Sequence, residues 1–274
     1  MKKTFLFFVL VFCSVALFAQ NVDWLWAKQA GGIQEDESYS IAVDTNGNSY
    51  VTGCFYGNAS FGTTTLTNSS NEYPDIFVAK LDSNGNWLWA KQAGGTSYDD
   101  GLSIAVDANG NSYVTGYFFG SASFGTTTLT GSGYDIFVAK LDSNGNWLWA
   151  KQAGGTVYDL GCSITVDDND NSYVSGCFYN NASFGTTTLT SSGGDDIFVA
   201  KLDSNGNWLW AKKAGGTLWD WSNGIATDSS GNTYLTGYFS GTASFGGINL
   251  TSSGGEDIFV AKAYIPYDSN DIVV

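Results

Sequence analysis

The chain has 274 residues and a net charge of −15, and its 11 basic residues are all lysines, with neither arginine nor histidine. The absence of histidine excludes Ser/His and Cys/His catalytic dyads, histidine-rich zinc sites and a general base whose ordinary pKa is near neutrality. The negative charge disfavours nucleic acids and anionic membrane surfaces as partners, which leaves cations, neutral sugars and proteins.

Residues 1–19 have the pattern of a secretory signal peptide. Lys2 and Lys3 precede an apolar run from Phe5 to Leu17, and the small residue Ala19 stands before the predicted cleavage site. The apolar run is too short to span a bilayer comfortably. We therefore expect a secreted or cell-surface protein with no membrane insertion after the leader is removed.

Four tandem repeats of about 60 residues follow at 20–263, and a C-terminal tail at 264–274 leaves the pattern. Each repeat holds four short segments that are rich in β-branched and aromatic residues and bounded by Asn, Asp and Gly, which predicts strands. In chain order they are a Trp-Leu-Trp-Ala-Lys segment (24–28, 87–91, 147–151, 208–212), an Ile-Ala-Val-Asp-like segment (41–44, 104–107, 164–167, 225–228), a Tyr-Val-Thr-Gly-like segment (50–53, 113–116, 173–176, 234–237) and an Asp-Ile-Phe-Val-Ala-Lys segment (75–80, 135–140, 196–201, 257–262).

The turns between these segments indicate which strands pair. Asp82–Asn86 and Asp107–Asn111 fit three-residue hairpin loops, in which a type I turn is followed by a left-handed residue at Gly85 or Gly110. Asp170 takes that position in the third repeat, and aspartate tolerates the left-handed region. The same turns resemble calcium loops in their oxygen ligands, but their glycine stands at position four instead of six, so the hairpin is the simpler interpretation.

Both faces of the predicted hairpin at 75–90 are apolar. One face carries Phe77, Ala79, Leu81, Trp87 and Trp89, and the other carries Ile76, Val78, Leu88 and Ala90. A sheet that is apolar on both faces must be covered on both, and blades stacked around an axis provide that cover.

The recurring motifs are Gly-Gly-Thr-x-x-Asp, Ser-Ile-Ala-Val-Asp-x-Asn-Gly-Asn-Ser-Tyr-Val-Thr-Gly and Asp-Ile-Phe-Val-Ala-Lys-Leu-Asp. They resemble the bacterial secreted β-propeller repeats (SBBP-type), a family named for a seven-bladed propeller, over essentially the whole mature chain. The resemblance implies an extracellular propeller without a shared activity. Four copies are present instead of seven, so we predict an all-β propeller of four blades, each with four antiparallel strands. The Trp-Leu-Trp motif that opens the chain, at 24–30, would complete the last blade and close the ring.

An aspartate recurs in every inter-blade loop, four residues after the second glycine of the Gly-Gly pair. These are Asp36, Asp99, Asp159 and Asp220. Four carboxylates around one mouth of a central channel would form a weak site for a hard cation such as Ca²⁺, although the sequence requires no cofactor. The alternative is that each aspartate caps the backbone of its own loop.

Positions that break the repeat are better candidates for recognising an asymmetric ligand. The fourth repeat places Trp219 and Trp221 in this loop, and they are the only tryptophans outside the repeated pairs. Tyr98 and Tyr158 stand at the position of Trp219 in the second and third repeats. Aromatic side chains beside acids suit a sugar or peptide surface, and the alternative is that they pack beneath the loop.

These features predict a non-catalytic extracellular binding or surface scaffold whose partner is a protein or glycan surface. One alternative is a carbohydrate-active enzyme, a glycosidase or lyase, that uses loop aspartates such as Asp99, Asp159 and Asp220. That chemistry needs two carboxyls with divergent pKa values at a defined separation, which a symmetric arrangement does not favour. The other alternative is a fragment of a larger secreted or cell-surface repeat protein.

The mature chain has three cysteines, Cys54, Cys162 and Cys177. Pairing Asp167 with Asn171 would set Cys162 opposite Gly176 and point Cys177 to the other side of the sheet, with Cys54 two blades away. We therefore predict three unpaired thiols, even though an exported protein is free to form disulfides.

Overall fold

The computed structural model describes residues 23–70, 72–228 and 230–263, so the predicted leader and tail lie outside the described residues. Within these ranges the chain forms 19 strands, which pair antiparallel, and no helix. The described part of the chain accordingly contains no helix that is long and apolar enough to cross a membrane. The all-β prediction is confirmed.

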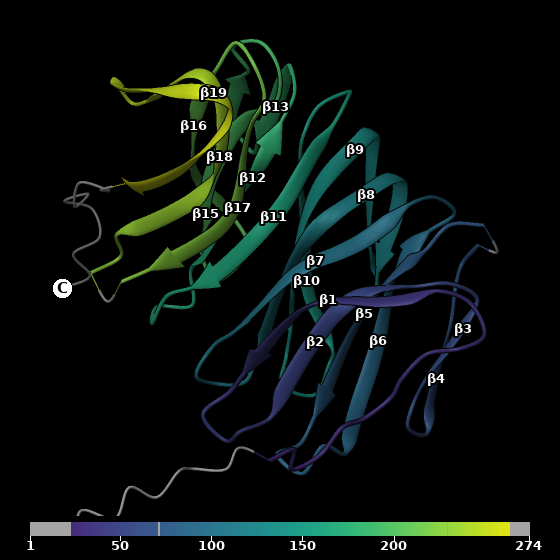
Figure 1. Ribbon diagram of the computed structural model, residues 1–274. Helices are drawn as coiled ribbons and strands as arrows, with labels where there is room; N and C mark the ends of the chain where they lie inside the picture. The colour runs from purple at the N-terminus through teal and green to yellow at the C-terminus, as the bar shows by residue number, and fades with distance from the viewer. Residues whose placement is uncertain (1–22, 71, 229, 264–274) are drawn as a thin grey trace, which may run out of the picture.

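The strands form four successive units, which Figure 1 shows side by side along the molecule. Unit 1 consists of β1 (Asp36–Val43), β2 (Ser49–Phe55), β5 (Asp75–Leu81) and β6 (Trp87–Gly95), with a small hairpin of β3 (Asn58–Phe61) and β4 (Thr64–Thr67). Unit 2 consists of β7 (Asp99–Val106), β8 (Ser112–Phe124), β9 (Thr127–Leu141) and β10 (Trp147–Ala153). Unit 3 consists of β11 (Asp159–Val166), β12 (Ser172–Phe178), β15 (Asp196–Leu202) and β16 (Trp208–Gly216), with the hairpin β13 (Asn181–Phe184) and β14 (Thr187–Thr190). Unit 4 consists of β17 (Asp220–Thr227), β18 (Thr233–Phe245) and β19 (Ile248–Ala263).

The hairpin turns are those that the sequence predicts. The φ angle is +76° at Gly85, +77° at Gly110 and +62° at Asp170, so all three lie in the left-handed region. Asp82 Oδ1 accepts hydrogen bonds from the backbone N–H groups of Asn84 (2.9 Å) and Asn86 (2.8 Å). The side-chain amide of Asn86 donates to Asp82 Oδ2 at 2.8 Å. The hairpin therefore accounts for the Asp-x-Asn-Gly-Asn pattern.

The Trp-x-Trp segment contains a β-bulge that changes the predicted faces. The register shifts between Trp87 and Trp89, which leaves Leu88 without an opposite residue. As a result the two indoles pack on opposite sides of the unit, Trp87 against Phe61 (centroids 5.2 Å apart) and Trp89 against Tyr50 (6.2 Å). The prediction that both tryptophans share one face, and that Leu88 is buried on the other, is wrong because of this extra residue.

A second hairpin in each unit was not among the four predicted segments. It is separate in units 1 and 3, as β3–β4 and β13–β14, whereas in units 2 and 4 the same residues prolong β8–β9 and β18–β19. In unit 1 the hairpin buries Ala59, Phe61 and Leu66 between exposed polar residues. Phe61 packs on Phe77 of β5 at 5.0 Å, so the hairpin covers one face of its own unit.

Neighbouring units pack face to face through an interface that occurs three times. Tyr50, Ile76 and Val78 of unit 1 pack into the apolar face of unit 2. Tyr113, Ile136 and Val138 of unit 2 pack in the same way on unit 3, and Ile197 and Val199 of unit 3 pack on unit 4. The cores of the units are therefore continuous across the interfaces.

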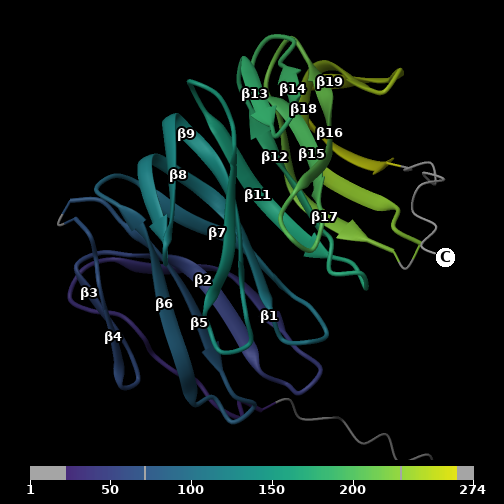
Figure 2. The same ribbon diagram turned by 180° about the vertical axis from the view of Figure 1, so that it is seen from behind.

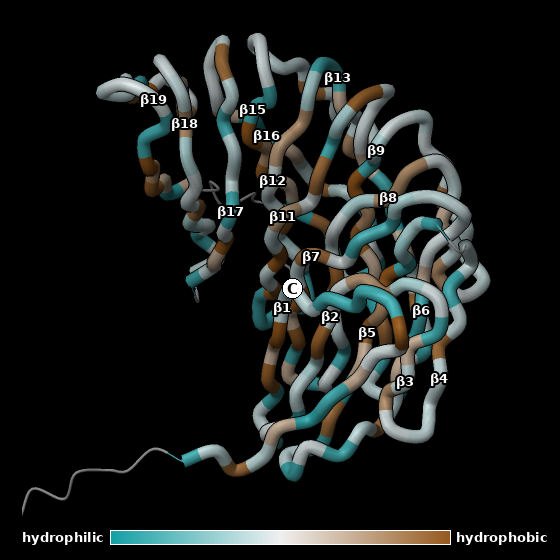
Figure 3. The backbone as a smooth tube through the Cα atoms, turned by 45° about the vertical axis from the view of Figure 1, so that its right-hand side comes forward, coloured by the Kyte–Doolittle hydropathy of each residue, from teal (hydrophilic) through white to brown (hydrophobic). Residues whose placement is uncertain are grey.

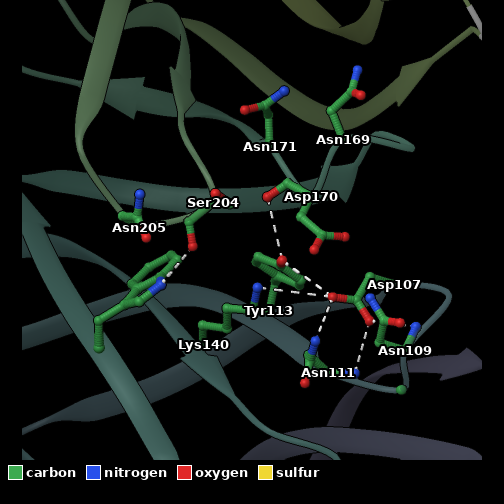
Figure 4. A network of polar contacts seen from close by, with 12 residues as sticks. Asp107, Asn109, Asn111, Tyr113, Lys140, Asn169, Asp170, Asn171, Ser204 and Asn205 are labelled. Carbon is green, nitrogen blue, oxygen red and sulfur yellow. Dashed lines mark hydrogen bonds and ion pairs between the residues drawn. The ribbon is translucent and has the colours of Figure 1, made fainter.

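Hydrogen bonds border these apolar contacts, and Figure 4 shows those between units 2 and 3. Trp149 Nε1 donates to the carbonyl oxygen of Ser204 (3.2 Å), and the Tyr113 hydroxyl donates to the carbonyl oxygen of Asp170 (3.3 Å). The first strands of neighbouring units are also linked, because in all three interfaces a backbone N–H donates to a serine Oγ of the preceding unit at 3.2 Å. The pairs are Ile104 to Ser40, Ile164 to Ser103 and Ile225 to Ser163.

The units form an open arc and not the predicted closed ring (Figures 1 and 2). Residues 24–30 form no strand, the Trp24 side chain is 92% exposed, and within the described residues β19 pairs with β18 alone. Closure by the N-terminal segment is therefore absent. The three interfaces share a serine–backbone hydrogen bond, and together they leave unit 4 apart from unit 1 (Figure 3).

Cys54, Cys162 and Cys177 are free, as predicted. The predicted register around Cys162 is wrong, because a bulge between Gly161 and Ser163 places Gly161 opposite Gly176. The bulged Cys162 is only half-buried, and its thiol donates to the carbonyl oxygen of Leu160 at 3.8 Å, whereas Cys177 is buried.

Candidate functional site

Each predicted loop aspartate caps the loop that joins one unit to the next. Asp99 Oδ2 accepts the backbone N–H of Gly95 (2.7 Å), and its Oδ1 accepts that of Phe119 (3.4 Å). Asp36, Asp159 and Asp220 make the corresponding pairs of bonds in their own loops. These hydrogen bonds correspond to the loop-capping role that the sequence analysis gave as the alternative to a cation site. The part of the chain that the structure describes contains no cluster of three or more acidic or cysteine side chains able to hold a metal ion.

A second buried aspartate faces the loop aspartate in each interface. A Cβ on Gly94 would meet Asp75 Oδ1 and would lie 3.1 Å from Asp99 Oδ2, so two carboxyl groups flank this glycine. Asp75 Oδ1 is buried and has no hydrogen-bond partner. Burial raises the pKa of Asp75 to about 6, and burial together with the nearby Asp75 charge raises the pKa of Asp99 to about 8.

The next two interfaces repeat this arrangement with one difference. Asp135 and Asp159 flank Gly154, and burial raises the pKa of Asp159 to about 7. In the last interface Lys213 Nζ lies 3.3 Å from Asp196 Oδ2, a contact that offsets part of the cost of burying that carboxylate. The carboxyl pairs are buried parts of the interfaces, which favours a structural role for them.

An open hollow on the loop face brings aromatic and acidic side chains together between units 3 and 4. Its volume is about 510 Å³, and it is lined by Tyr158, Tyr179, Gly193, Gly194, Asp195 and Trp219. The Trp219 side chain is 65% exposed and that of Tyr158 is partly exposed. The hollow therefore offers a flat indole, phenol groups and one carboxylate to a ligand from solvent.

Local packing fixes the walls of this hollow. The Trp219 indole lies so close to the backbone of Gly194 that a Cβ there would be 2.6 Å from Trp219 Cδ1, so this position requires glycine. Trp221 turns away and stacks on Tyr238 with centroids 6.2 Å apart. Its Nε1 donates to Asp195 Oδ2 at 3.1 Å, which holds the carboxylate in the wall. Burial raises the pKa of Asp195, and the Trp221 hydrogen bond opposes that increase.

Of the four aromatic residues proposed from the sequence, Tyr158 and Trp219 line the hollow together. Trp221 supports its wall from behind, and Tyr98 lies elsewhere, between units 1 and 2, where it packs on Tyr73 with centroids 4.6 Å apart. Sequence analysis missed Asp195 as a wall residue. It stands where the second repeat has Tyr134, and this departure from the repeat is the signal in the sequence that marks the position.

Comparison with protein families supports the repeat assignment. A family model described as "Beta-propeller repeat" (SBBP) matches residues 25–54, 88–117 and 209–238. Each match runs from a Trp-Leu-Trp segment to the Tyr-Val-Thr-Gly-like strand of the next unit. The resemblance that the sequence motifs indicated is confirmed.

Two curated proteins are similar to parts of the chain. One is an "Uncharacterized WD repeat-containing protein L264" of Acanthamoeba polyphaga mimivirus, 27% identical over 73% of this chain and 19% of its own length. The other is the "Regulatory protein FlaEY" of Caulobacter vibrioides, 28% identical over 48% of this chain and 14% of its own length. The chain thus spans less than a fifth of the length of each.

A crystal structure of a protein of unknown function from Bacteroides caccae is also similar. It has 11% sequence identity and a TM-score of 0.37, and the match covers 87% of this chain and 63% of that one.

Proposed function

We propose that this chain, whose repeats belong to the β-propeller repeat family, is an exported binding scaffold that holds a neutral or cationic partner at the hollow beside Trp219. The main support for this proposal is that the exposed indole of Trp219 lies beside the carboxylate of Asp195 in one hollow. Both residues stand at positions that depart from the repeat. Residues that recur build the units, whereas recognition of an asymmetric ligand requires departures from the repeat.

The chemistry of the hollow limits the classes of partner that could bind there. A flat aromatic face contacts the apolar side of a sugar ring or the side chains of an extended peptide, and it also attracts cations. Asp195 accepts hydrogen bonds from hydroxyl or ammonium groups. Because the protein carries a net charge of −15, an anionic partner would be repelled. A neutral glycan or a basic protein segment therefore fits this site.

Replacement of Trp219 tests the proposal. The purified protein is screened against a glycan array and against extracellular proteins, and the affinity of the partner found is measured for Trp219→Ala. We expect a loss of at least about tenfold, because exposed tryptophans dominate binding hot spots. Leu209→Ala is the control, since Leu209 is half exposed on β16 and lies outside the hollow. Equal affinities of both variants and the unmodified protein would contradict the proposal.

Asp195→Asn distinguishes the two classes of partner. Asparagine keeps the shape of the side chain and an oxygen acceptor for Trp221 Nε1 while it removes the charge. Affinity for a basic protein segment should fall and become less sensitive to salt. Affinity for a neutral glycan should change by less than about threefold, because a neutral amide oxygen still accepts its hydroxyl hydrogen bonds.

A further inference from the structure

The two ends of the arc expose apolar residues whose counterparts in the other units are buried or partly buried. At the first end, Ile41 of β1 is 63% exposed, whereas the corresponding Ile104 and Ile164 are each 5% exposed. A groove of about 340 Å³ lies on this face of unit 1. Its large apolar lining residues are Trp26, Ile41, Val51, Phe61, Phe77, Leu81 and Trp87.

The second end exposes the residues that insert into a neighbour at the other interfaces. Tyr234, Ile258 and Val260 of unit 4 are 36%, 81% and 76% exposed. They correspond to Tyr50, Ile76 and Val78 of unit 1, which unit 2 buries completely. Exposed apolar groups of this size at one edge mark an interaction surface.

These two surfaces are the two halves of one interface. Where unit 1 meets unit 2, its Tyr50, Ile76 and Val78 pack into a face of unit 2 that includes Ile104, Val114, Phe124, Phe137 and Leu141. The groove on unit 1 is built from the residues at the same positions, which are Ile41, Val51, Phe61, Phe77 and Leu81. The exposed face of unit 4 thus matches a groove of the same molecule that its own geometry keeps out of reach.

The N-terminal segment is already placed for this contact. Trp26 Nε1 donates to the carbonyl oxygen of Ser83 at 3.2 Å, as Trp89 Nε1 does to that of Ser143 in the next unit. Residues 24–30 therefore lie on unit 1 as β6 lies on unit 2. Since β6 also pairs with β5 of its own unit, a unit docked in the groove would find residues 24–30 beside the free edge of its β19.

We propose that unit 4 of one copy of this chain docks on unit 1 of a second copy. Tyr234, Ile258 and Val260 fill the groove, and residues 24–30 of the second copy add to β19 as the fourth strand of unit 4. The register follows from β5 and β6, where Val78 lies opposite Lys91, so Val260 lies opposite Lys28 of the second copy. Such a contact joins different surfaces, so it builds either a closed ring or a chain of copies.

One hydrogen bond that all three internal interfaces share cannot form at the exposed surface of unit 4. Ser40, Ser103 and Ser163 each accept a backbone hydrogen bond from the next unit, and Gly224 holds that position in unit 4. The association is therefore expected to be weaker than an internal interface and to depend on protein concentration.

The test uses two variants, each blocked at one end. Ile41→Asp places a charge in the groove, and Val260→Asp places one in the inserted face. Sedimentation velocity should show copies of the unmodified protein associating as concentration rises, whereas each variant alone stays monomeric. An equal mixture of the two variants should form dimers and nothing larger, because each retains one intact surface. Leu209→Asp, an equally disruptive change at an exposed position outside both surfaces, should associate normally.

Folding is checked by thermal denaturation of each variant, and both positions are exposed in the single copy, so both should fold. If a variant does not fold, Ile258→Lys or Val43→Lys replaces it at the same surface. A protein that stays monomeric at all concentrations overturns the proposal. So does an association that both charged variants retain, or a mixture of the variants that remains monomeric.

Discussion

At the scale of single residues, the buried carboxyl pairs couple the stability of the fold to pH. The pKa values of Asp75, Asp99 and Asp159 are raised to about 6, 8 and 7, against an ordinary value near 3.9 in the unfolded chain. Folding therefore favours their protonated forms. Their contribution to stability is complete below about pH 4 and is lost as pH rises through the folded values. The turn aspartates Asp44, Asp142 and Asp203 have lowered pKa values, so their contribution to stability is lost as the pH falls through those values.

We predict that the free energy of unfolding falls by at least about 1 kcal/mol between pH 5 and pH 8, because one unit of pKa shift corresponds to about 1.4 kcal/mol. Urea denaturation followed by tryptophan fluorescence measures it. Asp75→Asn should flatten this dependence, since the amide oxygen can still accept the Ser69 N–H while the amide nitrogen faces Asp99. Asp257→Asn is the matched control, because Asp257 holds the same position in unit 4 and accepts the corresponding backbone N–H, that of Ser253. Stability that rises over this range would contradict the assignment.

At the scale of the strands, serine hydroxyls fasten one unit to the next. Ser103 Oγ accepts the backbone N–H of Ile164 across the interface at 3.2 Å. We predict that Ser103→Ala destabilises the fold by about 1–3 kcal/mol, because it leaves that N–H without a partner inside the interface. Ser123→Ala, which removes an exposed hydroxyl on β8, should cost less than about 0.5 kcal/mol. Equal denaturation midpoints for the two variants would show that the hydroxyl does not link the units.

The strands also show what a sequence can and cannot specify. The turn at Asp82–Asn86 follows from residues adjacent in the chain, so its type and its left-handed glycine were predictable. The bulge at Leu88 was not, because hydrophobic alternation alone treats Trp87 and Trp89 as one face. The missed hairpin at Asn58–Thr67 was predictable, because its sequence recurs in every unit and its apolar residues alternate with polar ones at the period of a strand.

For the molecule as a whole, the sequence predicted an all-β fold built from successive repeats, but not that the last unit would have three strands and the arc would stay open. Ring closure depends on the rotation at each interface, which arises from many small contacts such as those of Tyr113 with Asp170 and of Trp149 with Ser204. No local pattern encodes that angle. The aromatic hollow shows the same limit: Trp219 was recognisable as a departure from the repeat, but its proximity to Tyr158 and Asp195 depends on how units 3 and 4 meet.

Because unit 4 lacks the serine of the other units, restoring it should strengthen the proposed contact between two copies of the chain. Gly224→Ser would restore the hydroxyl that Ser40, Ser103 and Ser163 supply, so that it accepts the Ile41 N–H of a docked copy. A Cβ at this position would lie 3.2 Å from Thr236 Cγ2, which requires a small adjustment of that side chain. One added hydrogen bond contributes about 0.5–1.5 kcal/mol, so the dissociation constant should fall roughly two- to tenfold in sedimentation equilibrium.

Gly224→Ala separates the hydroxyl from the rest of this change, because alanine adds the same Cβ and the same restriction of the backbone without an acceptor. The alanine variant should associate no more tightly than the unmodified protein, since the Ile41 N–H gains nothing from a methyl group. The order of affinities, with serine tightest, follows only if unit 4 meets unit 1 through the interface that joins the other units. Equal affinities for the serine and alanine variants would place the contact between copies on another surface.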